Sequence, residues 1–187
     1  MKKNIIINKK DGTAVKAEIK KLNKYYLDKV FNLDREVYKG LENKEFYFCS
    51  SREEFEDSLS GNGQVIGCVI PETDELIAMG VYKTYGYNEH NYGYDFNIKG
   101  KELLKVGQIE STVVHPKYRG NGLQLLICRI IEDIARENGN SMISATAAPD
   151  NKYSVNTFLK LGYEVMADKI KYGGLRRYVL MKKIDNR

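Results

Sequence analysis

The stretch "HPKYRGNGLQLLI", residues 115–127, joins two strong local patterns. The residues before it, "VGQIESTVV" (106–114), are rich in β-branched side chains and lead into Pro116, which predicts a strand. From Gly122 onward, apolar residues recur at intervals of three and four as far as Ala135, and Asn138-Gly139 ends the run. This pattern predicts the strongest helix of the chain. The stretch is therefore a glycine-containing turn between a strand and a helix N-terminus.

Such a turn favours an anionic ligand. Gly120 and Gly122 allow the backbone to approach a ligand closely, and the amide N–H groups from about Arg119 to Gln124 have no helical partner. The helix dipole adds partial positive charge at the same place, and Arg119 adds a full charge. We therefore expect a phosphate or pyrophosphate here.

Two common phosphate-binding motifs do not fit the turn. A P-loop requires Lys-Ser or Lys-Thr after its last glycine, where this chain has Leu123-Gln124. A dinucleotide fingerprint requires a third glycine at position 125, which is leucine.

Residues 114–123 instead resemble the acyl-CoA-binding motif of the GNAT N-acetyltransferase superfamily, (Gln/Arg)-x-x-Gly-x-(Gly/Ala) after a strand ending in Val-x-Pro. Lys117 takes the first position, and Gln124 stands where the family usually has a small residue. Residues 151–163 are similar to the family's downstream segment, Asn-x-x-(Ala/Ser)-x-x-x-(Tyr/Phe)-x-x-x-Gly-(Phe/Tyr). The two motifs together are far more specific than either one, and the family-like order of elements covers residues 13–184.

The rest of the chain divides into alternating strand and helix patterns. A strand, helix and strand in succession imply a right-handed parallel pair, whereas the first half is mostly antiparallel. We expect hairpins over 4–22 and 64–86, helices over 24–41, 51–61 and 150–162, a long ordered loop over 82–96, and strands over 141–149, 163–172 and 175–184.

The resemblance implies an α/β fold with a mixed, mostly antiparallel central sheet of about seven strands. One parallel pair splays apart near Val114 and Ala145, and helices cover both faces. We expect residues 1–187 to form a single domain, with an extra strand and turn in residues 1–12.

The resemblance also implies how acetyl-CoA binds as acyl donor. Pantetheine pairs with the strand backbone in the gap, and the pyrophosphate sits on the turn. Asn151 contacts the ligand from the opposite wall, or is only a helix cap, a role that Asp150 could equally fill. The expected contacts are Val113, Val114, Arg119, Gly120, Asn121, Gly122, Leu123, Gln124, Asn151, Ser154 and Phe158.

Acetyl transfer to an amine requires a base, because a lysine-like amine at pH 7 must lose a proton at a cost of about 4–5 kcal/mol. Glu110 lies four residues before Val114 on the same strand face, so it is either that base or a structural carboxylate paired with a lysine. Backbone N–H groups near Val114 would stabilise the oxyanion.

The general acid is less clear in the sequence. Many relatives have a tyrosine where this chain has Phe158, which carries no proton to donate. Ser154 lies one turn earlier on the same helix and could relay a proton through water. Tyr153, Tyr172 and Tyr178 are further candidates.

The acceptor pocket is expected to contain Tyr85, Tyr87, Tyr92 and Tyr172, which could hold an amine by cation–π contact. Arg176 and Arg177 favour an acidic acceptor or are only solvated. The expected function is transfer of acetyl from acetyl-CoA to a primary amine of a small molecule or peptide, by direct attack on the thioester. The alternative is a non-catalytic acyl-CoA-binding sensor or interaction domain, which Phe158 favours.

Composition limits the other classes. The net charge of +5 is explained by a solvated surface or by anionic ligands, and without a zinc-finger or RNP motif we expect no nucleic-acid partner. The three cysteines share no CxxC spacing and neither histidine lies near one, so we expect no metal and a reduced, cytoplasmic protein. The apolar runs are too short for a membrane span or a signal peptide. A homodimer is a common family arrangement.

Overall fold

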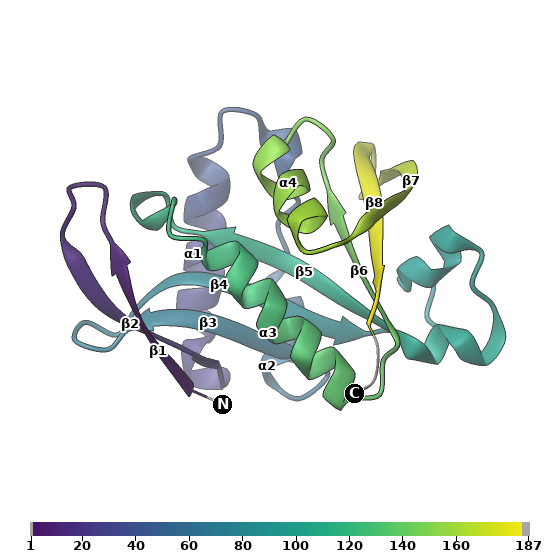
Figure 1. Ribbon diagram of the computed structural model, residues 1–187, viewed down its shortest axis with the longest axis horizontal. Helices are drawn as coiled ribbons and strands as arrows, with labels where there is room; N and C mark the ends of the chain where they lie inside the picture. Colours follow the sequence, from purple (N-terminus) through teal and green to yellow (C-terminus); the bar gives the residue numbers. More distant parts are fainter. Residues whose placement is uncertain (1, 185–187) are drawn as a thin grey trace.

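The computed structural model describes residues 2–184, and its centre is one eight-stranded sheet (Figure 1). The strand order is β1-β2-β3-β4-β5-β6-β8-β7, and only the β5/β6 pair is parallel. The strands are β1 (Lys2–Asn8), β2 (Ala14–Lys21), β3 (Gln64–Ile70), β4 (Glu75–Thr84), β5 (Val106–Val114), β6 (Met142–Ala147), β7 (Glu164–Lys171) and β8 (Leu175–Lys183).

Helices cover both faces of the sheet, as Figure 1 shows. On one face, α3 (Leu123–Glu137) and α4 (Lys152–Lys160) bury Ile127, Ile131 and Phe158 against the strands. On the other face, α1 (Leu27–Lys39) and α2 (Arg52–Leu59) bury Val30 and Phe55. The expected mixed sheet with one parallel pair and helices on both sides is confirmed.

Local signals set most of the helix boundaries. The Ser51 hydroxyl accepts from the Glu54 N–H at 3.1 Å while the Glu54 carboxylate accepts from the Ser51 N–H at 2.7 Å, so the predicted capping box starts α2. The helix predicted from residue 24 begins three residues later, because a 3₁₀ turn over Lys24–Tyr26 precedes α1 and is capped by Asn23.

Two features differ from expectation. The sheet has eight strands rather than about seven, and β1 occupies one edge of it. Tyr82 lies within β4, not in a loop, and its buried hydroxyl donates to Asn140. The loop proper runs from residue 85 to 105 and contains 3₁₀ turns over Tyr92–Phe96 and Gly100–Lys105.

Within residues 2–184, no helix combines the length and the apolar composition that crossing a bilayer requires.

Candidate active site

The two parallel strands at the centre of the sheet separate part-way along their length. β5 and β6 pair from Val106↔Met142 to Ile109↔Ala145, and no pair follows. Both strands continue, β5 to Val114 against β4 and β6 to Ala147 against β8. The result is a gap in the sheet with an unpaired edge on each side.

The exposed edge of β5 presents the backbone of Val114. The N–H of His115 donates to the carbonyl of Ile77 on β4 at 2.8 Å. Because hydrogen-bonded and non-bonded pairs alternate along an antiparallel ladder, the N–H and C=O of Val114 face away from β4 and into the gap. By the same alternation Val113 directs its backbone toward Met79, so of the two valines expected to pair with a ligand only Val114 has free groups at the gap.

A β-bulge reshapes β5 just beyond the last parallel pair. The register shifts between Met79/Val81, so Ser111 and Thr112 stand opposite Gly80 alone. Ser111 adopts a left-handed backbone, with φ of 47°, and its hydroxyl hydrogen-bonds that of Ser50 at 2.8 Å. A Cβ at Gly80 would lie 2.7 Å from Ile127, so glycine here lets α3 pack closely under the bulge.

The glycine turn lies at the far end of β5 and leads into α3. Gly120 and Gly122 have left-handed backbones, with φ of 92° and 66°, and no atom lies within 4 Å of a Cβ built on either. Gly122 is the N-cap residue and no side chain caps the helix, so the first amides of α3 remain available. The turn therefore has open space and uncapped amides where the sequence predicts an anion.

Two of the expected site residues do not line the cavity at the gap. The Asn121 side chain turns away from it, because its Oδ1 accepts from the N–H of Asn8 at 2.8 Å and its Nδ2 donates to the Asn8 carbonyl at 2.7 Å. Asn121 thus anchors the end of β1. Tyr87 is exposed on the surface loop.

The N-terminal turn of α4 forms the wall opposite β5. Asn151 is the N-cap of this helix and its Oδ1 accepts from the Ser154 N–H at 3.2 Å, so the cap function is present, while Asn151 also lines the cavity. The Gln124 amide reaches across from α3, donating to Thr112 at 3.1 Å and to Ser154 at 3.4 Å. Phe158 is buried edge-to-face against Tyr163 at the base of this wall.

Glu110 is the first residue of β5 beyond the parallel pairing. Its Oε2 accepts from the Tyr85 hydroxyl at 3.2 Å and its Oε1 accepts from Gln108 at 3.1 Å. No described lysine or arginine lies within 4 Å of it, so it forms none of the ion pairs of residues 2–184. Burial raises the pKa of Glu110, partly offset by the charge of Lys83 and the Tyr85 hydrogen bond. A carboxylate with a raised pKa at the mouth of the gap is suited to accept a proton.

A cluster of aromatic hydroxyls lies beside Glu110. The Tyr92 and Tyr172 hydroxyls hydrogen-bond each other, and Tyr172 also hydrogen-bonds Thr146 of β6 at 2.9 Å. Phe48, from the loop between α1 and α2, stacks on the Tyr172 ring with centroids 4.9 Å apart and planes inclined by 12°. Burial raises the pKa of Tyr172, so the phenol stays protonated at neutral pH.

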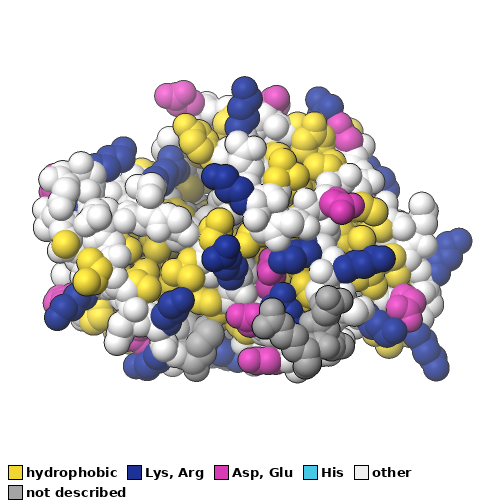
Figure 2. Space-filling view, viewed as in Figure 1, with side chains coloured by type: hydrophobic (Ala, Val, Ile, Leu, Met, Phe, Trp, Pro, Cys, Tyr) yellow, Lys and Arg dark blue, Asp and Glu magenta, His cyan; other side chains and the backbone are white. Residues whose placement is uncertain are grey.

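Most of these groups line one cavity of about 1550 Å³. That exceeds the roughly 300–1,000 Å³ of a typical small-molecule site, so there is room for a donor and an acceptor together. Figure 2 shows the surface hollowed between the β5–α3 turn and α4. The expected residues that line it are Tyr85, Tyr92, Glu110, Val113, Val114, Arg119, Gly120, Gly122, Leu123, Gln124, Asn151, Ser154, Phe158 and Tyr172.

Several lining residues were not predicted from the sequence. They include Tyr47, Phe48, Ser111 and Thr146. The run "EFYFC" (45–49) between two predicted helices was the available signal, because adjacent aromatics in a connecting loop are unusual unless they pack on something.

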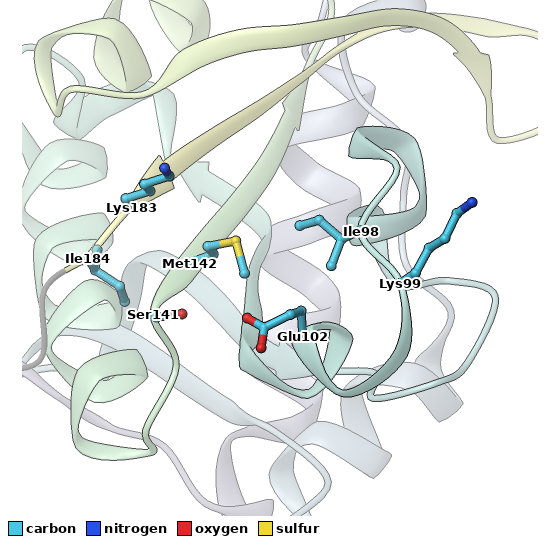
Figure 3. Close-up of a pocket in the computed structure, with 7 residues that line it drawn as sticks. All are labelled: Ile98, Lys99, Glu102, Ser141, Met142, Lys183 and Ile184. Carbon is cyan, nitrogen blue, oxygen red and sulfur yellow. The ribbon is translucent and has the colours of Figure 1, made fainter.

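A second, smaller cavity of about 530 Å³ contains none of the expected site residues. It lies where β6 begins, between the loop before β5 and the end of β8, and Ile98, Glu102, Met142 and Ile184 are among its lining (Figure 3). Among residues 2–184 there is no group of three or more His, Cys, Asp or Glu side chains placed to hold a metal ion. The basic side chains visible in Figure 2 are spread among acidic and apolar ones over that face.

The site thus combines a sheet opened at its one parallel pair with a glycine turn at a helix N-terminus. Residues 27–163 match the model of the Acetyltransferase (GNAT) family. The match covers more than half of the sequence, so the chain belongs to this family. A search of curated proteins found no match.

Solved structures of low sequence identity share the fold. An acetyltransferase of the GNAT family from Streptococcus pneumoniae matches with a TM-score of 0.69 and 16% identity, covering 90% of this chain and 99% of that one. NAA60 from Arabidopsis thaliana, in complex with a bisubstrate analogue, matches with a TM-score of 0.70 and 12% identity, covering 90% of this chain and 99% of that one. YncA from Salmonella typhimurium, with its cofactor acetyl-CoA, matches with a TM-score of 0.64 and 16% identity, covering 90% of this chain and 94% of that one.

Proposed function

We propose that the protein transfers the acetyl group of acetyl-CoA to a primary amine of a small molecule or peptide, by direct attack on the thioester. The observation that carries the proposal is the unpaired edge of β5 at Val114, which lies between the glycine turn and Glu110. The acetyl-CoA in the YncA structure supports the choice of donor. We also propose that residues 1–187 form a single domain.

The donor binds along the gap between β5 and α4. The pyrophosphate takes the free amides from Gly120 to Gln124, with Arg119 adding charge. Pantetheine pairs with the backbone carbonyl of Val114, as an added strand would, which leaves the Val114 N–H free. The side chains of Asn151 and Ser154 contact it from α4, and Phe158 gives the apolar wall behind them.

The reaction needs two proton transfers. Glu110 accepts one proton from the acceptor ammonium, the resulting neutral amine nitrogen forms its bond to the acetyl carbon, and the N–H of Val114 stabilises the oxyanion. The C–S bond then breaks, the thiolate takes a proton from a hydroxyl or from water, and the second proton lost by the nitrogen restores that donor. Phe158 has no proton to give, so the donor is the Tyr172 hydroxyl at the gap, or Ser154 through water.

Of the tyrosines considered as proton donors, Tyr172 is the best placed. Tyr153 is 90% exposed, whereas the Tyr172 hydroxyl is tied to Thr146 where the strands separate. Phe158 replaces the family's usual tyrosine, which favours a second candidate function, a non-catalytic acyl-CoA sensor with the same donor site.

One experiment separates these functions. A thermal melt with acetyl-CoA at about a hundredfold over Kd should show a stabilisation of about 2.7 kcal/mol, or roughly 5–10 °C. Thiol release is then followed with a broad panel of amines, using Glu110→Gln as the control for catalysis. A melting shift together with thiol release supports the transferase, provided that Glu110→Gln abolishes the release. A melting shift without thiol release supports the sensor. The absence of a shift would contradict both.

A further inference from the structure

Two adjacent arginines of β8 have opposite environments. Arg176 is exposed and forms a two-point ion pair with Asp168, with Nη2 2.6 Å from Oδ2 and Nε 3.0 Å from Oδ1. Arg177 is only 3% exposed and forms no ion pair within 4 Å among residues 2–184. Its Nη1 donates to the Arg176 carbonyl at 2.8 Å, while its buried Nη2 has no hydrogen-bond partner.

An unpaired guanidinium at this depth is energetically unfavourable. Buried charges in proteins are usually paired, and arginine cannot relieve the penalty by losing its proton. The Tyr172 ring, whose centroid lies 5.7 Å from the Arg177 guanidinium carbon, offers only a cation–π contact. The charge of Glu45 acts on Arg177, but Glu45 forms no ion pair with it within 4 Å, so the guanidinium is free to bind an oxyanion.

The guanidinium of Arg177 is not placed to bind the donor phosphates. Arg177 lines the candidate cavity, but β8 lies beyond β6 from β5 in the sheet order, while the glycine turn follows β5. Figure 1 shows α4 between the β7–β8 hairpin and that turn. The neighbouring cation on this wall, Lys171, is already neutralised by Asp95 at 2.6 Å.

Arg177 and Glu110 line the same cavity as Tyr172. Both charges act on the Tyr172 phenol, where Glu110 raises the pKa and Arg177 lowers it. An acceptor with its amine at Glu110 would thus extend past Tyr172 and the stacked Phe48 toward the guanidinium.

We propose that Arg177 binds an oxyanion carried by the acceptor, so that the substrate is a primary amine that also bears a carboxylate or phosphate. The inference rests on the proposed function and adds the substrate class to it. A guanidinium fork matches either oxyanion with two parallel hydrogen bonds, and Nη2 is free to make one of them.

The test compares amines that differ only in the anionic group. The panel holds aliphatic and aromatic amino acids, their carboxamides, and the matching aminoalkyl phosphates. Initial rates of thiol release are measured at limiting amine. The amines that bear a carboxylate or a phosphate should have kcat/KM values about 10- to 100-fold above those of the carboxamides, as expected for a hydrogen bond to a charged group. The better of the carboxylate and phosphate series identifies the oxyanion.

Variants assign the preference to Arg177. Arg177→Gln should abolish the preference, Arg177→Lys should retain part of it, and the matched control Arg176→Gln should leave it unchanged. If Arg177→Gln fails to fold, the wild-type comparison still decides. Equal or faster turnover of the carboxamides, or a preference that survives in folded Arg177→Gln, would overturn the inference.

Binding at the donor site is measured separately from binding at the acceptor site. A melt with acetyl-CoA alone reports the proposed function, because Arg177 has no part in that binding. Acetyl-CoA could stabilise the protein while no amine with a carboxylate or phosphate is acetylated or adds further stabilisation. In that case the oxyanion inference fails while donor binding stands.

Discussion

The hydroxyl of Tyr85 donates a hydrogen bond to Oε2 of Glu110 at 3.2 Å. The bond joins the loop after β4 to β5 at the point where the parallel strands part. It lowers the pKa of Glu110, whereas burial, the larger effect, raises it. The surroundings of Glu110 therefore set its pKa, so a substitution at Tyr85 can change the protonation of the proposed base while the carboxylate itself is kept.

Tyr85→Phe should move the acidic limb of the pH–rate profile to higher pH. Glu110 must be ionised to accept a proton, so the rate rises as pH passes upward through its pKa. Removing the Tyr85 hydrogen bond removes an influence that lowers this pKa, so a higher pH is needed for the same ionised fraction. The measurement is kcat/KM against pH.

The matched control for that change is Tyr87→Phe, because Tyr87 is exposed and does not line the cavity. It should reproduce the wild-type profile. A limb that stays in place in Tyr85→Phe, or that survives in Glu110→Gln, would show that Glu110 is not the titrating base.

Gly122→Val should abolish the stabilisation by acetyl-CoA. A β-branched residue at φ of 66° is strained, and its side chain would occupy the open space where the phosphates are expected. Gly139→Val is the control, because Gly139 has φ of 78°, equally open surroundings, and a place at the other end of α3. Both variants should melt lower, but only Gly139→Val should keep the acetyl-CoA shift. Retention of that shift by Gly122→Val would exclude the turn as the phosphate site.

Much of the fold was predictable because its signals are local. The capping box of Ser51 and Glu54, the glycine turn after β5 and the apolar spacing of α3 each specify their own element. The parallel pair followed from the order of elements alone. The extra strand β1 was expected, but its attachment was not, because the contact of Asn121 with Asn8 spans 113 residues.

The acceptor end of the site was less predictable for the same reason. Its aromatic wall joins Phe48, Tyr92 and Tyr172 from three distant loops, so no spacing along the chain reveals it. The difference between Arg176 and Arg177 depends on which face of β8 each side chain takes and on Asp168 across the hairpin. Sequence alone left both arginines open to either interpretation.

Tyr172→Phe should lower kcat by about 10- to 100-fold if its hydroxyl protonates the leaving thiolate. Burial raises the pKa of Tyr172, so the phenol keeps its proton and wild-type activity should not decline between about pH 7 and 9. Ser154→Ala is the comparison, since its hydroxyl is held by Gln124 and would act only through water. A larger loss of kcat in Ser154→Ala than in Tyr172→Phe would assign the proton to Ser154.

Gln124→Ala should tighten acetyl-CoA binding by a few-fold. The Gln124 amide bridges Thr112 on β5 and Ser154 on α4, so it spans the opening that pantetheine must enter and has to swing aside. Breaking its two hydrogen bonds opposes binding by about 1 kcal/mol, or roughly fivefold in Kd. Calorimetric titration of acetyl-CoA measures the change, and Thr112→Val, which removes one of the two partners, should shift Kd in the same direction by less. Weaker binding in Gln124→Ala would instead make the amide a direct ligand of the donor, in which case Thr112→Val would leave Kd unchanged.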